Sequence, residues 1–269
     1  MAAAEPKKLA SGKLRLDFPA DHVARLTIDH AAKRNALDHE LLDAFAAELP
    51  RIEARCLLIT AAGPVFSAGY DIGNLQDADA IAEAEALVAH PFHAAIEALD
   101  AFPYPAVAAL NGHAIGGGLE LALSCDLRLA APDAKFGMPA ARLGLVYSHT
   151  GLRKFIDVIG VARTRELFYT ARNIDARRAY EWGLVNELVE DDELEQRAVE
   201  YAALIASNAP LSLRGNKLII GALLSAEGAL DERVSRELVE LREACFRTDD
   251  FAEGVRAFGE KRRPVWRGE

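Results

Sequence analysis

Residues 112–122 read GHAIGGGLELA, in which three consecutive glycines are followed two positions later by Glu120. The apolar segment PAVAALNGHA (105–114) predicts a buried strand, and residues 116–124 predict a helix that begins at the glycines. The first N–H groups of a helix have no partner within it, and glycines let a ligand oxygen come close to them. The segment is thus compatible with a site for a developing oxyanion. It is equally compatible with glycines that only allow close packing beside an exposed Glu120.

A second loop, VFSAGYDI (65–72), has a similar composition. It follows CLLIT (56–60), an apolar segment that predicts a short buried strand. Two loops of small residues, each ending a strand and opening a helix, could supply one N–H apiece to a single carbonyl oxygen. A nucleotide phosphate is a poorer match, because GGG fits neither GxGxxG nor the GxxxxGKS and GxxxxGKT forms of the phosphate-binding loop.

The rest of the chain alternates between strand and helix patterns. HVARLTID (22–29) alternates as a strand does, and Asp38 is placed to cap a helix over about 39–52. From about residue 151 the pattern is mostly helical, broken by GLVNELV (183–189). This order predicts an α/β core followed by helices. Two further elements are expected, a helix near 78–100 and a strand in CDLRLAAP (125–132).

Composition excludes several classes of protein. The 269 residues carry a net charge of −10 and contain no basic cluster of the size that nucleic-acid binding needs. No apolar run approaches the length of a membrane helix, and the first 16 residues read as a disordered leader rather than a signal peptide. Cys56, Cys125 and Cys245 are isolated among apolar neighbours. We therefore expect a cytoplasmic protein with reduced, buried thiols and no membrane or nucleic-acid partner.

Five segments occur in an order that resembles the crotonase superfamily, the enoyl-CoA hydratase/isomerase fold, over about residues 14–267. They are RLTIDHAAKRNALD, VFSAGYDIGNL, PAVAALNGHAIGGGLELALSCDLRLAAPDAKFGMP, GLVNELV and EGVRAFGEKRRPVW. The resemblance implies an α/β fold with a spiral of ββα repeats over 12–195. It also implies a helical C-terminal region over 196–269 that forms a homotrimer, or a hexamer made of two trimers.

The same resemblance implies a site for acyl-CoA thioesters. The amides of Tyr70 and Gly117 would form an oxyanion hole, and Glu120 would be the principal side chain. No metal or separate cofactor is expected, since CoA is carried on the substrate. Phe258 and Lys261 would reach the CoA of a neighbouring subunit. The other implied substrate-binding residues are Lys33, Arg34, Ala36, Ala68, Asp71, Gly116 and Ala140.

The sequence departs from the family hydratases at Ala140. Those enzymes carry a second glutamate after a proline, whereas Pro139 is followed here by alanine. Hydration is most easily written with two acid–base groups, so the missing carboxylate weakens the case for an ordinary hydratase. Arg142, close by, could bind a substrate carboxylate or simply be an exposed surface residue.

The segment LGLVYSHTG (143–151) offers Tyr147 and His149. Its Leu-Gly-x-x-Tyr pattern resembles the methylmalonyl-CoA decarboxylase branch, which also lacks the second glutamate. In a decarboxylase, loss of CO₂ would deliver the enolate directly, Tyr147 could hydrogen-bond the leaving carboxylate, and His149 would be a loop residue. That branch has histidine in place of Tyr70, but only the main-chain N–H of this residue is required.

Three functions therefore remain open. The first is an enzyme of the hydratase/isomerase kind that acts on acyl-CoA thioesters through a stabilised enolate. The second is a decarboxylase of methylmalonyl- or ethylmalonyl-CoA. The third is a non-catalytic acyl-CoA-binding scaffold that has lost one glutamate.

Overall fold

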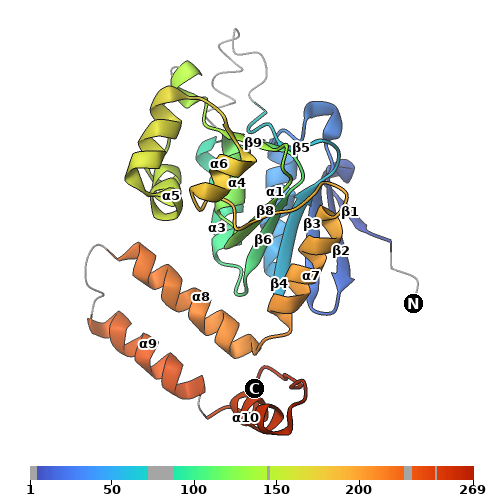
Figure 1. The fold of residues 1–269 in the computed structure, drawn as a ribbon, viewed down its shortest axis with the longest axis vertical. Coiled ribbons are helices and arrows are strands. Elements are labelled where there is room, and N and C mark those ends of the chain that lie inside the picture. Colours follow the sequence, from blue (N-terminus) through green and yellow to red (C-terminus); the bar gives the residue numbers. More distant parts are fainter. Residues whose placement is uncertain (1–4, 72–87, 144–145, 227–231, 246) are drawn as a thin grey trace.

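The computed structural model describes residues 5–71, 88–143, 146–226, 232–245 and 247–269. A twisted sheet forms the centre of the molecule, helices cover both of its faces, and further helices extend below it (Figure 1). In sheet order, the seven strands are β1 (Lys7–Leu9), β2 (Leu14–Ala20), β3 (Val23–Ile28), β4 (Cys56–Ala61), β6 (Ala106–Leu110), β8 (Leu127–Ala130) and β11 (Glu187–Leu188).

The first three strands are antiparallel, and the remaining strands continue the sheet in parallel. A second sheet of four short strands lies beyond the carboxyl ends of the parallel strands. Its order is β10 (Ile174–Asp175), β9 (Lys135–Gly137), β7 (His113–Ile115) and β5 (Val65–Ser67).

Alternation along the strands gives the large sheet two apolar faces. One face, which includes Leu26 and Ile59, packs with α1 (His39–Glu48) and α3 (His93–Asp100) in the main core. The other face packs with α7 (Leu194–Ala206). The remaining core helices are α4 (Gly117–Leu123), α5 (His149–Thr170) and α6 (Ala176–Glu181).

The predicted Asp38 cap is confirmed, because its Oδ1 accepts a hydrogen bond from Leu41 N at 2.9 Å. The disordered leader is wrong from Lys7 onward, since residues 7–9 form β1 and Leu14 in β2 is fully buried. Polar residues next to Leu14 and Leu16 made this segment look disordered, although the two leucines alternate with them as buried residues of a strand.

The expected single strand over 105–114 is also wrong, because it consists of β6 and β7 in different sheets. The chain turns between them at Gly112, where a Cβ atom would lie 2.1 Å from the carbonyl oxygen of Pro64. A helix was expected near 78–100. Residues 78–87 lie outside the described part, and α3 forms the last part of the expected helix.

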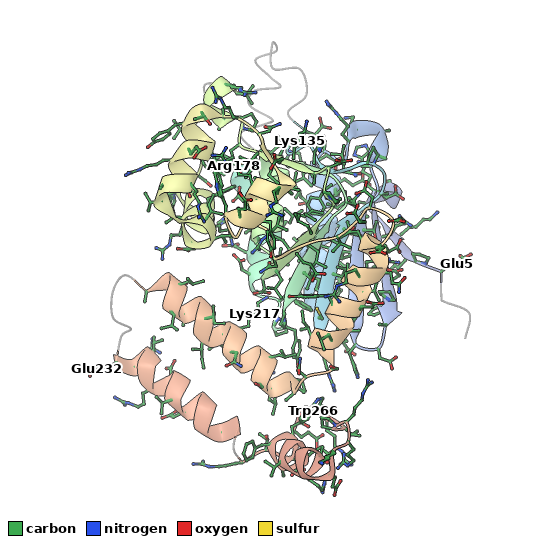
Figure 2. All side chains as sticks on the ribbon, in the orientation of Figure 1. Glu5, Lys135, Arg178, Lys217, Glu232 and Trp266 are labelled. Carbon is green, nitrogen blue, oxygen red and sulfur yellow. The ribbon has the colours of Figure 1, made fainter. Side chains whose placement is uncertain are left out.

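The C-terminal helices are α8 (Pro210–Ser225), α9 (Glu232–Cys245) and α10 (Asp249–Glu260). Lys217 of α8, labelled in Figure 2, joins this helix to the core. Its ammonium group pairs with Asp126 at 2.8 Å and donates to the Tyr104 carbonyl at 2.9 Å. Only Pro210 and Gly215 of α8 are buried in this single chain. Large apolar side chains of α8 are exposed, namely Leu218, Ile220, Leu223 and Leu224.

In the part of the chain that the structure describes, no helix has both the length and the apolar character to cross a membrane. Cys56 and Cys125 are buried free thiols, as expected. The side chain of Cys245 lies outside the described part.

Candidate active site

The loop that carries Tyr70 is held in an extended form by the segment before α1. Leu37 N donates to the Gly69 carbonyl at 2.8 Å, and Asp71 N donates to the Leu37 carbonyl at 2.9 Å. Successive amides of an extended chain point to opposite sides, so the N–H of Tyr70 points away from Leu37. This direction leaves the Tyr70 amide free to serve a ligand.

Asn35 fixes the turn that leads into this pairing. Its backbone is left-handed (φ 55°), a conformation that asparagine tolerates better than most residues. The buried side chain donates to the carbonyls of Ala62 at 2.8 Å and Val65 at 2.6 Å, and accepts from His30 N at 2.8 Å. Sequence analysis did not single out Asn35, although an asparagine between the strand expected at 22–29 and the helix expected after Asp38 was a usable signal for a turn.

The glycines start α4 beside this loop. Gly116 has φ 56° and ψ −125°, a combination open essentially to glycine alone, and its N–H donates to the Gly137 carbonyl at 2.9 Å. Gly117 is the first helical residue, so its N–H has no acceptor within the helix. A Cβ atom on Gly69 would lie 3.3 Å from Gly117 N. The backbone of the Tyr70 loop therefore lies directly against the free amide of Gly117.

The side chain of Tyr70 takes part in the site, which the sequence analysis missed. A Cβ atom on Gly117 would lie 2.3 Å from Cε1 of the Tyr70 ring, so the ring lies where a side chain at 117 would be. Phe92 packs edge-on against the same ring, with centroids 4.8 Å apart. The sequence did show a large aromatic residue among the small residues of VFSAGYDI. It did not show in which direction the Tyr70 ring points.

Three oxygen atoms meet at the end of this ring. The Tyr70 hydroxyl donates to Glu120 Oε2 at 3.3 Å, and the Tyr147 hydroxyl makes a short hydrogen bond to the same oxygen. The two hydroxyl oxygens are 3.3 Å apart. The structure thus brings together all four residues predicted as catalytic, namely Tyr70, Gly117, Glu120 and Tyr147.

Burial governs the titration of this group. Glu120 is 4% exposed, and desolvation raises the pKa of its carboxyl even though the hydrogen bond from Tyr147 opposes the shift. Burial is also the main cause that raises the pKa of the Tyr70 and Tyr147 hydroxyls, with the charge of Glu120 adding to it. Both phenols therefore keep their protons and act as donors.

Several predicted CoA-binding residues lie along the same pair of segments. Lys33 forms an ion pair with Asp71 at 2.7 Å, and Ala68 N donates to the Arg34 carbonyl at 3.0 Å. Ala36 is buried. Lys33 and Arg34 are both exposed, and the charge of Lys33 is balanced by Asp71.

Other predicted residues are not joined to this cluster. Ala140 is buried and Arg142 is exposed on a 3₁₀ turn, Ala140–Leu143. Lys261 is exposed just after α10, which lies far from α4 in Figure 1. The side chain of Phe258 lies outside the described part. His149 is exposed but is the first residue of the helix α5, so its interpretation as a loop residue is wrong; Ser148 caps the helix just before it.

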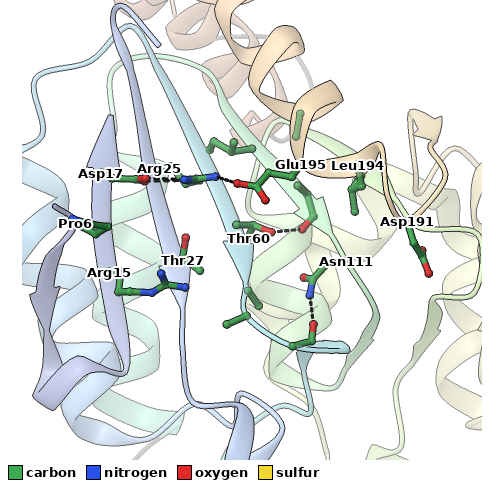
Figure 3. A pocket seen from close by; sticks show the side chains of 16 residues that line it. Pro6, Arg15, Asp17, Arg25, Thr27, Thr60, Asn111, Asp191, Leu194 and Glu195 are labelled. Atoms are coloured by element: carbon green, nitrogen blue, oxygen red, sulfur yellow. Dashed lines mark hydrogen bonds and ion pairs between the residues drawn. The ribbon is translucent and has the colours of Figure 1, made fainter. Parts of the chain in front are cut away.

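A polar hollow lies on the opposite face of the large sheet, next to the start of α7 (Figure 3). Arg25 lies between Asp17 and Glu195 and forms ion pairs with both, so its charge is already balanced. The sheet separates this hollow from the main core, in which Tyr70 and Tyr147 pack. Among the described residues, no group of three or more histidine, cysteine or acidic side chains could hold a metal ion.

Comparison with known proteins finds relatives of one kind over most of the chain. The family model described as enoyl-CoA hydratase/isomerase matches residues 20–269. The crotonyl-CoA hydratase of Syntrophomonas wolfei is 34% identical over 90% of this chain and 94% of its own length. The short-chain-enoyl-CoA hydratase of Clostridium acetobutylicum is 33% identical, with 90% and 92% covered. The crystal structure of an enoyl-CoA hydratase from Bacillus anthracis superposes with a TM-score of 0.86 at 32% identity, covering 96% of this chain and all of that one. This likeness confirms the predicted fold class.

We expect Glu120→Gln to stabilise the fold at neutral pH. Because the pKa of Glu120 is raised above its ordinary value of 4.5, the wild type binds its proton more tightly when folded and loses stability as pH rises through the folded pKa. A neutral glutamine does not suffer this loss. Urea unfolding between pH 4 and 8 should show an advantage of the variant that grows with pH.

Glu40→Gln is the control of opposite sign. The hydrogen bond from Lys13 lowers the pKa of Glu40, so this carboxylate stabilises the fold above its ordinary pKa and loses that effect as pH falls. The control variant should be the less stable one at pH 7. If Glu120→Gln behaved in the same way, burial would not be what governs Glu120.

Proposed function

Because the chain belongs to the enoyl-CoA hydratase/isomerase family, we propose that it converts acyl-CoA thioesters through an enolate held by the amides of Tyr70 and Gly117. The observation that carries this proposal is the approach of the Tyr70 loop to the start of α4, where neither amide donates a hydrogen bond to another of the described residues. One such donor contributes about 3 kcal/mol to stabilising an oxyanion. No cofactor beyond the CoA of the substrate is required.

We propose hydration or isomerisation of an enoyl-CoA as the reaction. Ala140 supplies no carboxylate, so Glu120 transfers the proton by itself. In hydration, the oxygen of a water molecule bonds to the β-carbon of the enoyl group while Glu120 accepts a proton from that water. Glu120 then returns the proton to the α-carbon of the enolate. In isomerisation, it takes a proton from one carbon and returns it to another. Burial raises the pKa of Glu120 above its ordinary value of 4.5, which makes its carboxylate a stronger base toward water or a carbon-bound proton.

Glu120→Gln should lower kcat for hydration of crotonyl-CoA by about 10²- to 10⁴-fold, because the glutamine cannot carry the proton. The dissociation constant of butyryl-CoA, measured by calorimetry, should change only a few-fold. Glu97→Gln, on the exposed face of α3, is the matched control and should retain full activity.

Mass spectrometry of the incubated mixtures extends this test. Tight binding of every acyl-CoA tried, with no product from the wild type, would contradict catalysis. That result would favour the non-catalytic acyl-CoA-binding scaffold instead.

A malonyl-type decarboxylase is the second candidate, and the position of Tyr147 favours it. Its hydroxyl already hydrogen-bonds a carboxylate, that of Glu120, and no second carboxylate stands at Ala140. In this reaction the bond between the α-carbon and the carboxylate breaks, its electron pair forms the enolate, and CO₂ leaves. A proton then returns to the α-carbon. Tyr147 would orient the departing group.

If decarboxylation is the activity, Tyr147→Phe should reduce CO₂ release from methylmalonyl- or ethylmalonyl-CoA about tenfold to a hundredfold, the value of a hydrogen bond to a charged group. Tyr169→Phe, a 76% exposed residue of α5, should leave the rate unchanged. Rapid hydration of crotonyl-CoA by a protein that leaves malonyl thioesters untouched would eliminate this candidate.

We propose that the exposed apolar side chains of α8 form a contact between copies of the chain in a trimer, or in a hexamer of two trimers. Leu218 and Leu223 are 54% and 56% exposed in the single chain, and exposed apolar patches of this kind mark contacts between proteins. Light scattering should give about three or six times the chain mass of 29.1 kDa. Leu223→Glu should dissociate the assembly, whereas a wild type that is monomeric would refute the proposal.

A further inference from the structure

The Tyr70 side chain lies against both Gly117 and Glu120, the two groups that the proposed function assigns to the acyl thioester. Gly117 and Glu120 are three residues apart on α4 and so share one face of the helix. The Tyr70 ring covers Gly117, and its hydroxyl reaches Glu120. The ring therefore extends from the proposed oxyanion amide to the proposed proton-transfer group and bounds the space between them.

The ring is held from several sides. Phe92, which is 3% exposed, packs edge-on behind it. The hydroxyl donates to Glu120, and the Tyr147 hydroxyl oxygen lies 3.3 Å from it. The main chain of Tyr70 is fixed by its pairing with Leu37. Because these contacts would all have to change together, the ring can move aside only at the cost of its packing and its hydrogen bonds.

We propose that the Tyr70 ring limits the acyl group to a short one, and so determines the chain-length specificity of this site. The inference rests on the proposed function, since it takes the cluster to be an acyl-CoA site. A short acyl group ends before it reaches the ring and Phe92. A longer one must displace the ring, and each methylene that an apolar pocket cannot accommodate costs about 10- to 200-fold in discrimination.

Unreactive saturated thioesters test this inference by binding alone. Calorimetry should show that the wild type binds butyryl-CoA at least tenfold more tightly than decanoyl-CoA. Tyr70→Ala removes the ring, so the ratio of its affinity for decanoyl-CoA to its affinity for butyryl-CoA should rise at least tenfold over the wild-type ratio. Tyr70→Phe retains the ring and should keep the wild-type preference, which separates the ring from the hydroxyl.

Tyr70→Leu covers the case in which the alanine variant fails to fold, because leucine still packs against Phe92 and should give an intermediate preference. Equal binding of both thioesters by the wild type would overturn the inference, and so would an unchanged ratio in the folded variants. Failure of the proposed function would look different, because no thioester would then bind to the wild type or be turned over.

Discussion

The absence of a side chain at Gly117 allows two loops to share one small space. The Tyr70 ring occupies the position that a Cβ atom at 117 would need, and the free amide of Gly117 lies beside the backbone of Gly69. Any larger residue at 117 would have to push the ring, and with it the Tyr70 loop, away from α4. The three glycines are thus explained by separate constraints, since Gly116 also supplies a backbone conformation that starts the helix and Gly118 packs against Ser67.

Those constraints explain how a carboxylate can be buried in the first turn of α4. A buried charge is costly unless its hydrogen bonds are satisfied, and Glu120 has two phenol donors on one oxygen. A helix N-terminus adds a favourable field for negative charge. Desolvation still outweighs these contributions, which is why the pKa of Glu120 is raised. Burying this carboxyl therefore costs the folded state stability once the group is ionised.

Much of the fold followed from local patterns. The alternation in β3, the Asp38 cap of α1 and the glycine start of α4 each depend on neighbouring residues, so the sequence predicted them. The resemblance to the enoyl-CoA hydratase/isomerase family likewise rested on motifs in order and is confirmed. The division of residues 105–114 into two strands was not predictable, because the break depends on the close approach of Pro64 to Gly112. The direction of the Tyr70 side chain was also not predictable, because the ring packs against Phe92, which is more than twenty residues away in the sequence.

The arrangement also indicates how one carboxylate could suffice on the proposed mechanism. Both phenols donate to Oε2, so that oxygen carries hydrogen bonds while Oε1 has none recorded among the described residues. A Cβ atom on Gly151 would lie 2.8 Å from Oε1, so a glycine keeps side chains away from this second oxygen. Oε1 is therefore the better placed of the two to accept and return a proton. Tyr70 and Tyr147 would then orient Glu120 rather than replace the carboxylate missing at Ala140, and one oxygen would do the work of two groups.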